Sequence, residues 1–302
     1  MLKLYGLTVD VVEGVPDDVP RGAADLRWRR IGSDAIPARS PGEGWAWRAF
    51  IGEDDVACSF AVSPDGREIV SHATPAVREA GLFGLFAEAV MRTVLRRLGA
   101  VSFHGATLSA DDRAVMLLGG KRAGKSSLAA ALVLAGWSPV SDDLSRVVEG
   151  ADGWRVPAGY RRGKLHSDAA TALGFDPERL SRRWTSGASP DAPGNKWMLP
   201  EADAAPPEAP LAAIYVLGDR RVGAAPLSVA PLAPIERVAE LLSHFSDDPL
   251  DAPASPPAAA KAMVLAIARG VPVLRLSLAD DLGRLPEAAE ALSALHTKVE
   301  RN

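Results

Sequence analysis

The sequence LLGGKRAGKSSLAAALVLAGWSPVSDD, residues 117–143, decides the fold of this chain. Its segment GGKRAGKS satisfies the pattern G-x-x-x-x-G-K-[ST], with Gly119, Gly124, Lys125 and Ser126 at the fixed positions. An apolar run precedes the pattern, and a segment rich in Ala and Leu follows it. This context predicts a strand, a glycine-rich loop and a helix, which is the arrangement that holds phosphate groups.

The pattern suits a phosphate ligand for physical reasons. Glycines let backbone N–H groups turn toward the phosphates, and the start of the helix adds the positive end of its dipole. Lys125 is expected to bridge the outer phosphates, and the Ser126 hydroxyl to bind Mg²⁺. We expect the nucleotide to contact the whole stretch of Gly119, Gly120, Lys121, Arg122, Ala123, Gly124, Lys125, Ser126 and Ser127. Lys121 and Arg122 either add positive charge to the site or are simply solvated.

Two carboxylates close the opening stretch. Asp142 and Asp143 follow the predicted helix and a short segment of strand character, WSPVS. Such a pair also occurs in turns or as a helix N-cap. We expect the strand to lie beside the strand of the glycine loop, so that its end delivers the pair to the phosphate site. One carboxylate would then hold Mg²⁺ and the other accept a proton from an acceptor hydroxyl, and the residues alone leave the order open.

Further candidate residues lie on either side of this stretch. The segment SFHGATLS predicts that His104 lies on the strand that precedes the strand of the glycine loop, although an isolated histidine is more often structural. Beyond the acidic pair, AGYRRGKLHSD contributes Arg161, Arg162 and Lys164. These cations are either solvated or close to the transferred phosphoryl group, where an arginine would stabilise the developing charge. We expect Arg162 to take the catalytic role.

Composition excludes several classes of protein. The chain has 302 residues, 47 % of them hydrophobic and 24 % charged, which is typical of a globular protein with one large or two small cores. The formal net charge of -4 gives no general attraction to nucleic acid or an anionic membrane, and we expect neither as a partner. The single cysteine, Cys58, excludes an intrachain disulfide and suits a reducing cytoplasm.

The chain has no sequence feature of a membrane or secreted protein. Its first residues, MLKLYGLTVDVVEG, contain no long apolar core, which argues against a signal peptide or an anchor. The longest apolar stretches are broken by charges before the roughly 18 to 20 residues that a membrane span needs. We therefore expect a soluble, cytoplasmic protein.

The sequence predicts two domains, 1–98 and 99–302. In the first, VACSFAVSPDGREIVSH predicts two strands joined by a hairpin turn, and Trp28, Trp45 and Trp47 are expected to anchor the core or the domain interface. Apolar residues at three- and four-residue spacing predict a helix over 74–100. In the second, we expect strands at 211–219 and 271–279, a helix at 285–300 and Pro-rich loops at 185–210 and 247–260.

Three segments together resemble a known family. FHGATL (103–108), GGKRAGKSSLAAALVLAGW (119–137) and VSDD (140–143) are similar in order and spacing to the catalytic domain of bacterial HPr kinase/phosphorylase and its relatives. The resemblance covers about residues 100–148. It implies an α/β fold with a P-loop kinase core of the HPr kinase / phosphoenolpyruvate carboxykinase type, preceded here by a small N-terminal strand-rich module.

The resemblance also implies roles for individual residues. Lys125 and Ser126 would bind the phosphates of ATP and Mg²⁺. Asp142 would be the general base toward the acceptor hydroxyl, Asp143 the metal partner, and His104 a neighbour that orients the acidic pair, with the two aspartate roles open to exchange. True HPr kinases carry a Glu-x-Arg-Gly stretch after the pair, and AGYRRGKLHSD has Arg-Gly without the glutamate, so phosphorylase activity is not implied.

The N-terminal module points to a subgroup of this family. It is more similar to that of HPr-kinase-related proteins found with ribosomal-peptide tailoring genes, including lasso peptide kinases, than to the regulatory domain of true HPr kinases. The implied activity is ATP- and Mg²⁺-dependent phosphorylation of a serine in a peptide or small protein, and a homo-oligomer is expected because HPr kinases are hexamers. A small-molecule kinase and a non-catalytic, nucleotide-dependent regulatory protein are the alternatives.

Overall fold

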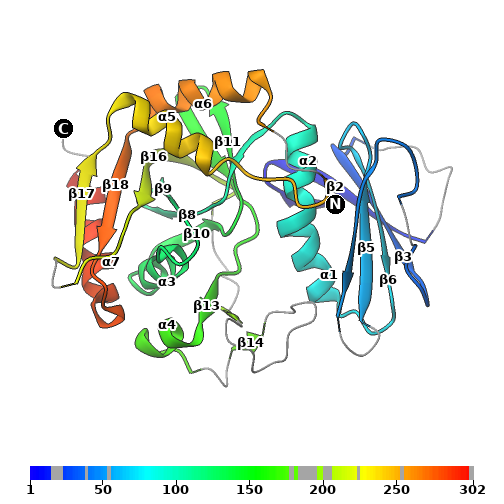
Figure 1. Cartoon of the computed structure of the whole chain (residues 1–302), viewed down its shortest axis with the longest axis horizontal. Helices are drawn as coiled ribbons and strands as arrows, with labels where there is room; N and C mark the ends of the chain where they lie inside the picture. Colours follow the sequence, from blue (N-terminus) through cyan, green and yellow to red (C-terminus); the bar gives the residue numbers. More distant parts are fainter. Residues whose placement is uncertain are drawn as a thin grey trace.

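The computed structural model of the chain describes residues 1–14, 23–37, 40–52, 56–176, 180–182, 196–199, 206–222, 225–251 and 255–298. These residues form a mixed α/β structure with two main sheets and a helical segment between them (Figure 1). The strands of the first sheet come from residues 2–73, and those of the second from residues 101–278. None of the helices in the described ranges combines the length and apolar character that a membrane crossing requires.

The first sheet has six strands in the order β1-β2-β3-β6-β5-β4. They are β1 (Leu2–Leu4), β2 (Leu7–Glu13), β3 (Leu26–Gly32), β4 (Ala46–Ile51), β5 (Ala57–Val62) and β6 (Glu68–Ala73). The predicted hairpin is confirmed, since β5 and β6 pair antiparallel around a turn in which Gly66 adopts a φ of 74°. Trp28 of β3 is 1 % exposed and stacks on Phe86 at 4.0 Å between ring centroids. Trp28 is thus a core anchor, as expected, and it fixes the following helix on this sheet.

The helical segment differs from the predicted continuous helix over 74–100. It consists of α1 (Glu79–Leu85), the π-helical turn η1 (Phe86–Val90) and α2 (Met91–Arg97). The start is later than predicted because Thr74 still bonds the sheet, its N–H donating to Ala57 O and its hydroxyl accepting from Ala57 N. The π turn places Glu88 inside the protein with 7 % exposure. Single π turns within α-helices often mark functional positions.

The second sheet carries the glycine loop. Its strands are β7 (Val101–Phe103), β8 (Gly105–Ala110), β9 (Arg113–Gly119), β10 (Ser138–Ser141), β11 (Ser145–Gly150), β12 (Gly153–Pro157), β16 (Glu208–Leu217), β17 (Leu227–Pro231) and β18 (Val273–Leu278). The strands expected at 211–219 and 271–279 are confirmed as β16 and β18, which run parallel to each other, while β16 is also parallel to β9.

The predicted position of the strand before the acidic pair is wrong in one respect. β10 pairs with β8 and does not lie beside β9. The reason is that β8 folds back on β9 through a tight turn and occupies that side of it. Because β10 and β9 are both antiparallel to β8, they run in the same direction and end at the same edge of the sheet. The acidic pair therefore still reaches the edge where the glycine loop begins.

Helices cover both faces of this sheet (Figure 1). On β16, Ile214 and Val216 face the core under α5 (Pro234–Ser243) and α6 (Ala258–Gly270), and Tyr215 faces the core under α3 (Lys125–Leu134) and α7 (Leu285–Lys298). This alternation follows from the two-residue period of a strand buried on both faces. The C-terminal helix predicted at 285–300 is confirmed over the described part of that range.

Smaller elements complete the described structure. They are α4 (Ser167–Ala172), the 3-10 turn η3 (Leu282–Arg284) and a three-stranded sheet of β13 (Lys164–His166), β15 (Lys196–Met198) and β14 (Ser181–Arg182). Most of the loop predicted at 185–210 lies outside the described residues, and β15 and the start of β16 occupy the described part. The loop predicted at 247–260 ends in helix α6, which begins at Ala258.

Candidate active site

The loop between β9 and α3 joins the strand directly to the helix and contains several residues with positive φ. Gly124 has a φ of 103° and directly precedes the first residue of α3. Gly124, the N-cap residue, has no side chain that could cap this helix start. The backbone N–H groups and the dipole of a helix start favour an anion at this point. Gly119, Gly120, Lys121, Arg122, Ala123, Gly124, Lys125, Ser126 and Ser127 are thus placed in one strand–loop–helix unit, as the sequence predicts.

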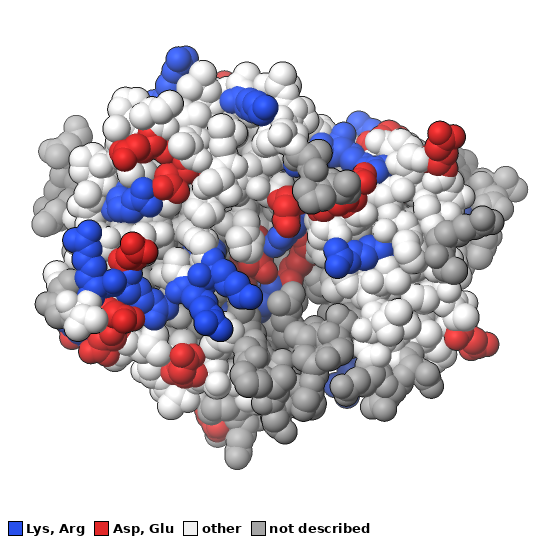
Figure 2. Space-filling view, viewed as in Figure 1, with Lys and Arg blue, Asp and Glu red and all other residues white. Residues whose placement is uncertain are grey.

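Basic groups surround this loop. The Lys125 ammonium folds over it and donates to Gly119 O at 2.5 Å and to Gly120 O at 3.4 Å. Arg220, which follows β16, donates from Nη2 to Arg122 O at 3.2 Å, and its Nη1 lies 3.6 Å from Asp280. Figure 2 shows Lys and Arg side chains gathered over the region of α3 and β18, beside a hollow that contains acidic and basic side chains. Sequence reasoning missed Arg220, because nothing in the local segment LGDRR links it to the glycine loop.

Replacement of Gly124 by alanine is expected to weaken ATP binding roughly tenfold or more. Its φ of 103° is strained for any L-residue, and an added Cβ would lie 3.2 Å from Leu278 Cδ1, so relief requires the loop to move. Gly136→Ala is the matched control, with a φ of 95° and no atom within 4 Å of the added Cβ. The control should lower the melting temperature and leave the ATP dissociation constant unchanged in calorimetry. Equal ATP affinities for the two variants would contradict this prediction.

His104 lies in a bend and not on the predicted strand. β7 ends at Phe103 and pairs with β11, whereas β8 begins at Gly105 and pairs with β9, so the chain changes partner strands at His104. Gly105 permits the close approach, since a Cβ there would lie 2.7 Å from Leu117 O. The bend turns the imidazole toward the acidic pair, with Nδ1 3.1 Å from Asp143 O and 3.7 Å from Asp143 Oδ1.

The acidic pair occupies the crossover between β10 and β11. A chain of buried hydroxyls fixes this crossover, with Ser145 Oγ 2.7 Å from Ser141 Oγ and 2.8 Å from Thr107 Oγ1. Asp142 N donates to Tyr160 O at 2.7 Å, and Asp143 adopts a φ of 65°. Positive φ is uncommon outside glycine, and strained residues of this kind gather at functional sites. The side chains of the neighbouring residues Asp142 and Asp143 point in different directions.

Asp143 belongs to a buried group of charges centred on Lys164. The Lys164 ammonium lies 2.8 Å from Asp143 Oδ2 and 2.5 Å from Glu88 Oε2, and its side chain is 1 % exposed. Glu88 comes from the π turn η1, so the first sheet's helical segment contributes directly to the site. Sequence reasoning placed Lys164 in a loop near the acceptor and missed Glu88. The available signal was that Glu88 is the single charge in the run GLFGLFAEAVM.

The surrounding charges control the ionisation of this group. Burial alone would raise the pKa of Asp143, but Lys164, His104 and Arg92 outweigh it and hold the pKa well below its ordinary value. Burial lowers the pKa of His104. His104 Nδ1 lies 3.1 Å from Arg92 Nη2, which can only donate, and 3.1 Å from Asp143 O, which can only accept, so the two contacts favour opposite tautomers of the neutral ring. Asp143 is thus a fixed anion beside a neutral imidazole near pH 7.

The lowered pKa of His104 predicts a stability that depends on pH. The folded state binds fewer protons than the unfolded state below the ordinary histidine pKa of about 6.5, so the free energy of unfolding should fall as the pH drops through this range. In His104→Asn, the difference in unfolding free energy between pH 7.5 and 5.5 should be smaller than in the wild type. Denaturant titrations at the two pH values measure it, and an unchanged difference would exclude a contribution from His104.

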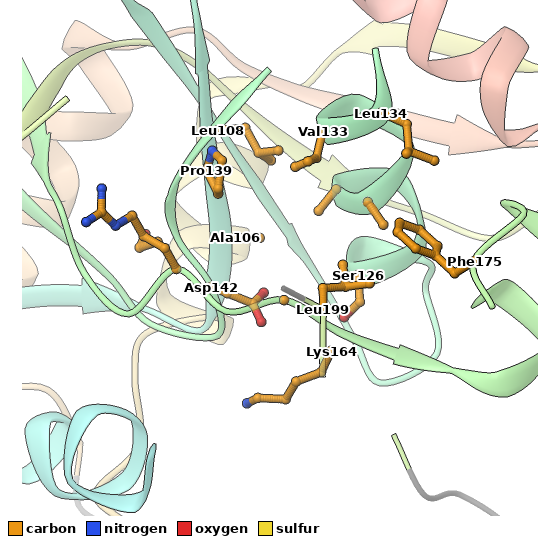
Figure 3. Close-up of a pocket in the computed structure, with 15 residues that line it drawn as sticks. Ala106, Leu108, Ser126, Val133, Leu134, Pro139, Asp142, Lys164, Phe175 and Leu199 are labelled. Carbon is orange, nitrogen blue, oxygen red and sulfur yellow. The ribbon is translucent and has the colours of Figure 1, made fainter. Parts of the chain in front are cut away.

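Asp142 lines a cavity of about 250 Å³, and Lys164, at the centre of the charge group, lines it as well (Figure 3). Ser126, the second residue of α3, lines the same cavity, and so do Arg161 and the backbone at Gly163. Asp143, His104 and Lys125 do not line it. Arg162, the expected catalytic arginine, also lies outside the lining, and its Nε donates to Leu199 O at 3.2 Å. A direct catalytic role for Arg162 stays a prediction.

The residues of the site fit Mg²⁺ only together with phosphate oxygens. Within the described residues, no group of three or more His, Cys, Asp and Glu side chains is arranged to hold a metal ion. Mg²⁺ is usually bound by one or two carboxylates together with substrate phosphates and water, all of them hard oxygen ligands. The ionised Asp143 and the Ser126 hydroxyl supply oxygens of this kind, so the donor set is compatible with a nucleotide-borne Mg²⁺.

Comparison with known proteins gives matches among solved structures alone. No family model matches the sequence, and no curated protein matches it. Among solved structures, the chain matches the HPr(Ser) kinase/phosphatase from Coxiella burnetii with 16 % sequence identity and a TM-score of 0.33. The match covers 67 % of this chain and 99 % of that chain. A TM-score of this size does not establish a common fold.

Proposed function

We propose that this chain is a kinase that transfers the γ-phosphoryl group of ATP to a serine hydroxyl of a peptide or small protein. The observation that carries the proposal is the position of Asp142, whose carboxylate lines one cavity with Ser126 at the start of α3. A carboxylate in the same pocket as the start of a helix that follows a glycine-rich loop is suited to accept a proton from a hydroxyl during transfer.

Different residues of the site would bind the phosphates, accept the proton and stabilise the developing charge. The N–H groups at the start of α3, together with Lys125, would hold the phosphates, and Asp142 would accept the proton from the serine hydroxyl. The serine oxygen forms a bond to the γ-phosphorus while the bond to the β,γ-bridging oxygen breaks, and ADP leaves. Mg²⁺, bound through Ser126 and Asp143, would neutralise charge on the phosphates. Arg161, which lines the cavity, is suited to stabilise the charge that develops on the transferred group.

The fixed charge of Asp143 supports this assignment of roles to the two aspartates. Its carboxylate is held by Lys164 and kept ionised, so it is a poor proton acceptor and a good ligand for a cation. Asp142 lines the cavity together with Ser126, whereas Asp143 does not. This favours Asp142 as the base and Asp143 as the metal partner. A ribosomal precursor peptide of the lasso type is the acceptor we propose to test first.

Incubation with ATP labelled at the γ-phosphate and serine-containing peptides tests the proposal. We expect label on the serine of at least one peptide, located by mass spectrometry, and no label with Lys125→Met, which lacks the ammonium over the loop. Free serine and glycerol in parallel reactions test a small-molecule acceptor. Binding of ATP with hydrolysis only, and no labelled hydroxyl product, would overturn the kinase assignment.

A further inference from the structure

The cavity beside Asp142 has a polar and an apolar part. In Figure 3, Asp142, Ser126 and Lys164 lie toward one side, while Leu108, Val133, Leu134 and Pro139 lie together on the opposite side. The apolar wall is built from the side of α3 and from β8 and β10. A partly open pocket that is mostly apolar and has a carboxylate and a lysine at one end is typical of a ligand-binding site.

The size of the cavity limits what the occupant can be. Its volume of about 250 Å³ is below the range of about 300 to 1,000 Å³ for pockets that enclose a whole ligand. It therefore suits one side chain or one ring. The wall also includes Phe175 and Leu199, whose apolar surfaces favour an uncharged group.

The position of the cavity favours the acceptor over the nucleotide. The phosphates are expected at the start of α3, and the cavity extends from Ser126 along the side of the same helix toward Leu134. A nucleotide base in this space would fill the volume beside Asp142 that an acceptor hydroxyl needs in order to give up its proton. A hydroxyl at the polar end would instead lie between Asp142 and the γ-phosphate, with its neighbouring group in the apolar part.

We propose that this cavity binds an apolar side chain of the acceptor, from the residue next to the phosphorylated serine. The proposal rests on the proposed kinase function and adds the substrate class: a serine flanked by a residue such as Val, Leu or Phe. Burial of the flanking side chain would fix the hydroxyl at Asp142, because rigid placement of the reacting groups is a large part of such catalysis. The size of the cavity would then set the preferred flanking residue.

Peptides that differ only at the flanking position test the size preference. The probes are two series in which Gly, Ala, Val, Leu or Phe precedes or follows a single serine. Binding is measured in the presence of a non-hydrolysable ATP analogue and compared with the transfer rate. We expect Leu to bind at least about tenfold tighter than Ala in one series. Equal affinity across both series would overturn the proposal.

Two variants that change the cavity in opposite directions separate a size effect from general damage. Ala129→Leu fills the cavity and should shift the preference toward Gly and Ala, whereas Val133→Ala enlarges it and should shift the preference toward Phe. Ala135→Leu is the matched control, because Ala135 is exposed at the end of α3 and outside the lining. The control should keep the wild-type preference. The same preference in all three variants would also overturn the proposal.

The binding measurement separates this inference from the kinase assignment. Size-dependent peptide binding without any transfer would support the cavity assignment and refute the kinase. Transfer at the same rate for every flanking residue would support the kinase and refute the cavity assignment. If Ala129→Leu weakened binding of the ATP analogue and left peptide binding unchanged, the cavity would belong to the nucleotide and the proposal would fail.

Discussion

Replacement of Asp142 by asparagine is expected to lower the rate of phosphoryl transfer about 10²- to 10⁴-fold, which is the usual contribution of a general base. The amide keeps the shape of the side chain and loses the ability to take a proton. Because the backbone N–H of residue 142 still donates to Tyr160 O, the crossover should keep its geometry. ATP affinity, measured by calorimetry, should therefore stay at its wild-type value while kcat falls.

Two further variants define what this result means. Asp152→Asn removes a carboxylate from an exposed turn between β11 and β12 and should leave kcat unchanged. Asp143→Asn should act differently from Asp142→Asn, because it removes a partner of Lys164 and so lowers stability as well as activity. If Asp142→Asn transferred phosphate at the wild-type rate, the proton would go elsewhere and the assignment of the base would be wrong.

Replacement of Lys164 by methionine is expected to cost about 3 to 5 kcal/mol of unfolding free energy, the usual effect of breaking a buried ion pair by removing one partner. The ammonium contacts Glu88 and Asp143 and is almost completely buried, so its loss leaves two carboxylates without their shared counter-ion. Denaturant titration at pH 7.5 measures the loss. Lys261→Met, at an exposed lysine on α6, is the control and should change stability by less than about 0.5 kcal/mol.

The double variant Glu88→Gln/Lys164→Met distinguishes charge from packing. Removing one carboxylate charge along with the ammonium should restore part of the lost stability, since the destabilisation comes from uncompensated buried charge. A double variant less stable than Lys164→Met alone would show that the loss comes from side-chain packing. In that case the ion-pair group would have no special role in the site.

The parts of the structure that depend on local sequence could be predicted. The glycine loop follows from residue types at fixed spacing, and the β5–β6 hairpin follows from SPDG between two alternating runs. The strands at 211–219 and 271–279 and the C-terminal helix have periodic apolar patterns, and all three are present. In each case the deciding interactions lie within about ten residues along the chain.

The parts that depend on strand order and distant contacts could not be predicted. β10 lies beyond β8 because β8 folds back on β9, and no local pattern encodes which side of β9 a later strand will take. His104 belongs to a bend because its neighbours pair with different strands. Glu88 and Arg220 reach the site through the tertiary fold, and the same holds for the direction in which Lys164 points. The acidic pair itself was predictable as a motif, but the separate surroundings of its two members were not.

The contact between Glu88 and Lys164 also has a consequence for how this protein can change over generations. The two residues are 76 positions apart in the chain and form a buried ion pair. A change of Lys164 alone leaves two buried carboxylates without their shared counter-ion, whereas a joint change of Lys164 and Glu88 to neutral residues leaves only Asp143. A related chain without Lys164 is therefore expected to lack Glu88 as well, and a hybrid that joins the first 98 residues of this chain to a relative without this lysine should fold poorly.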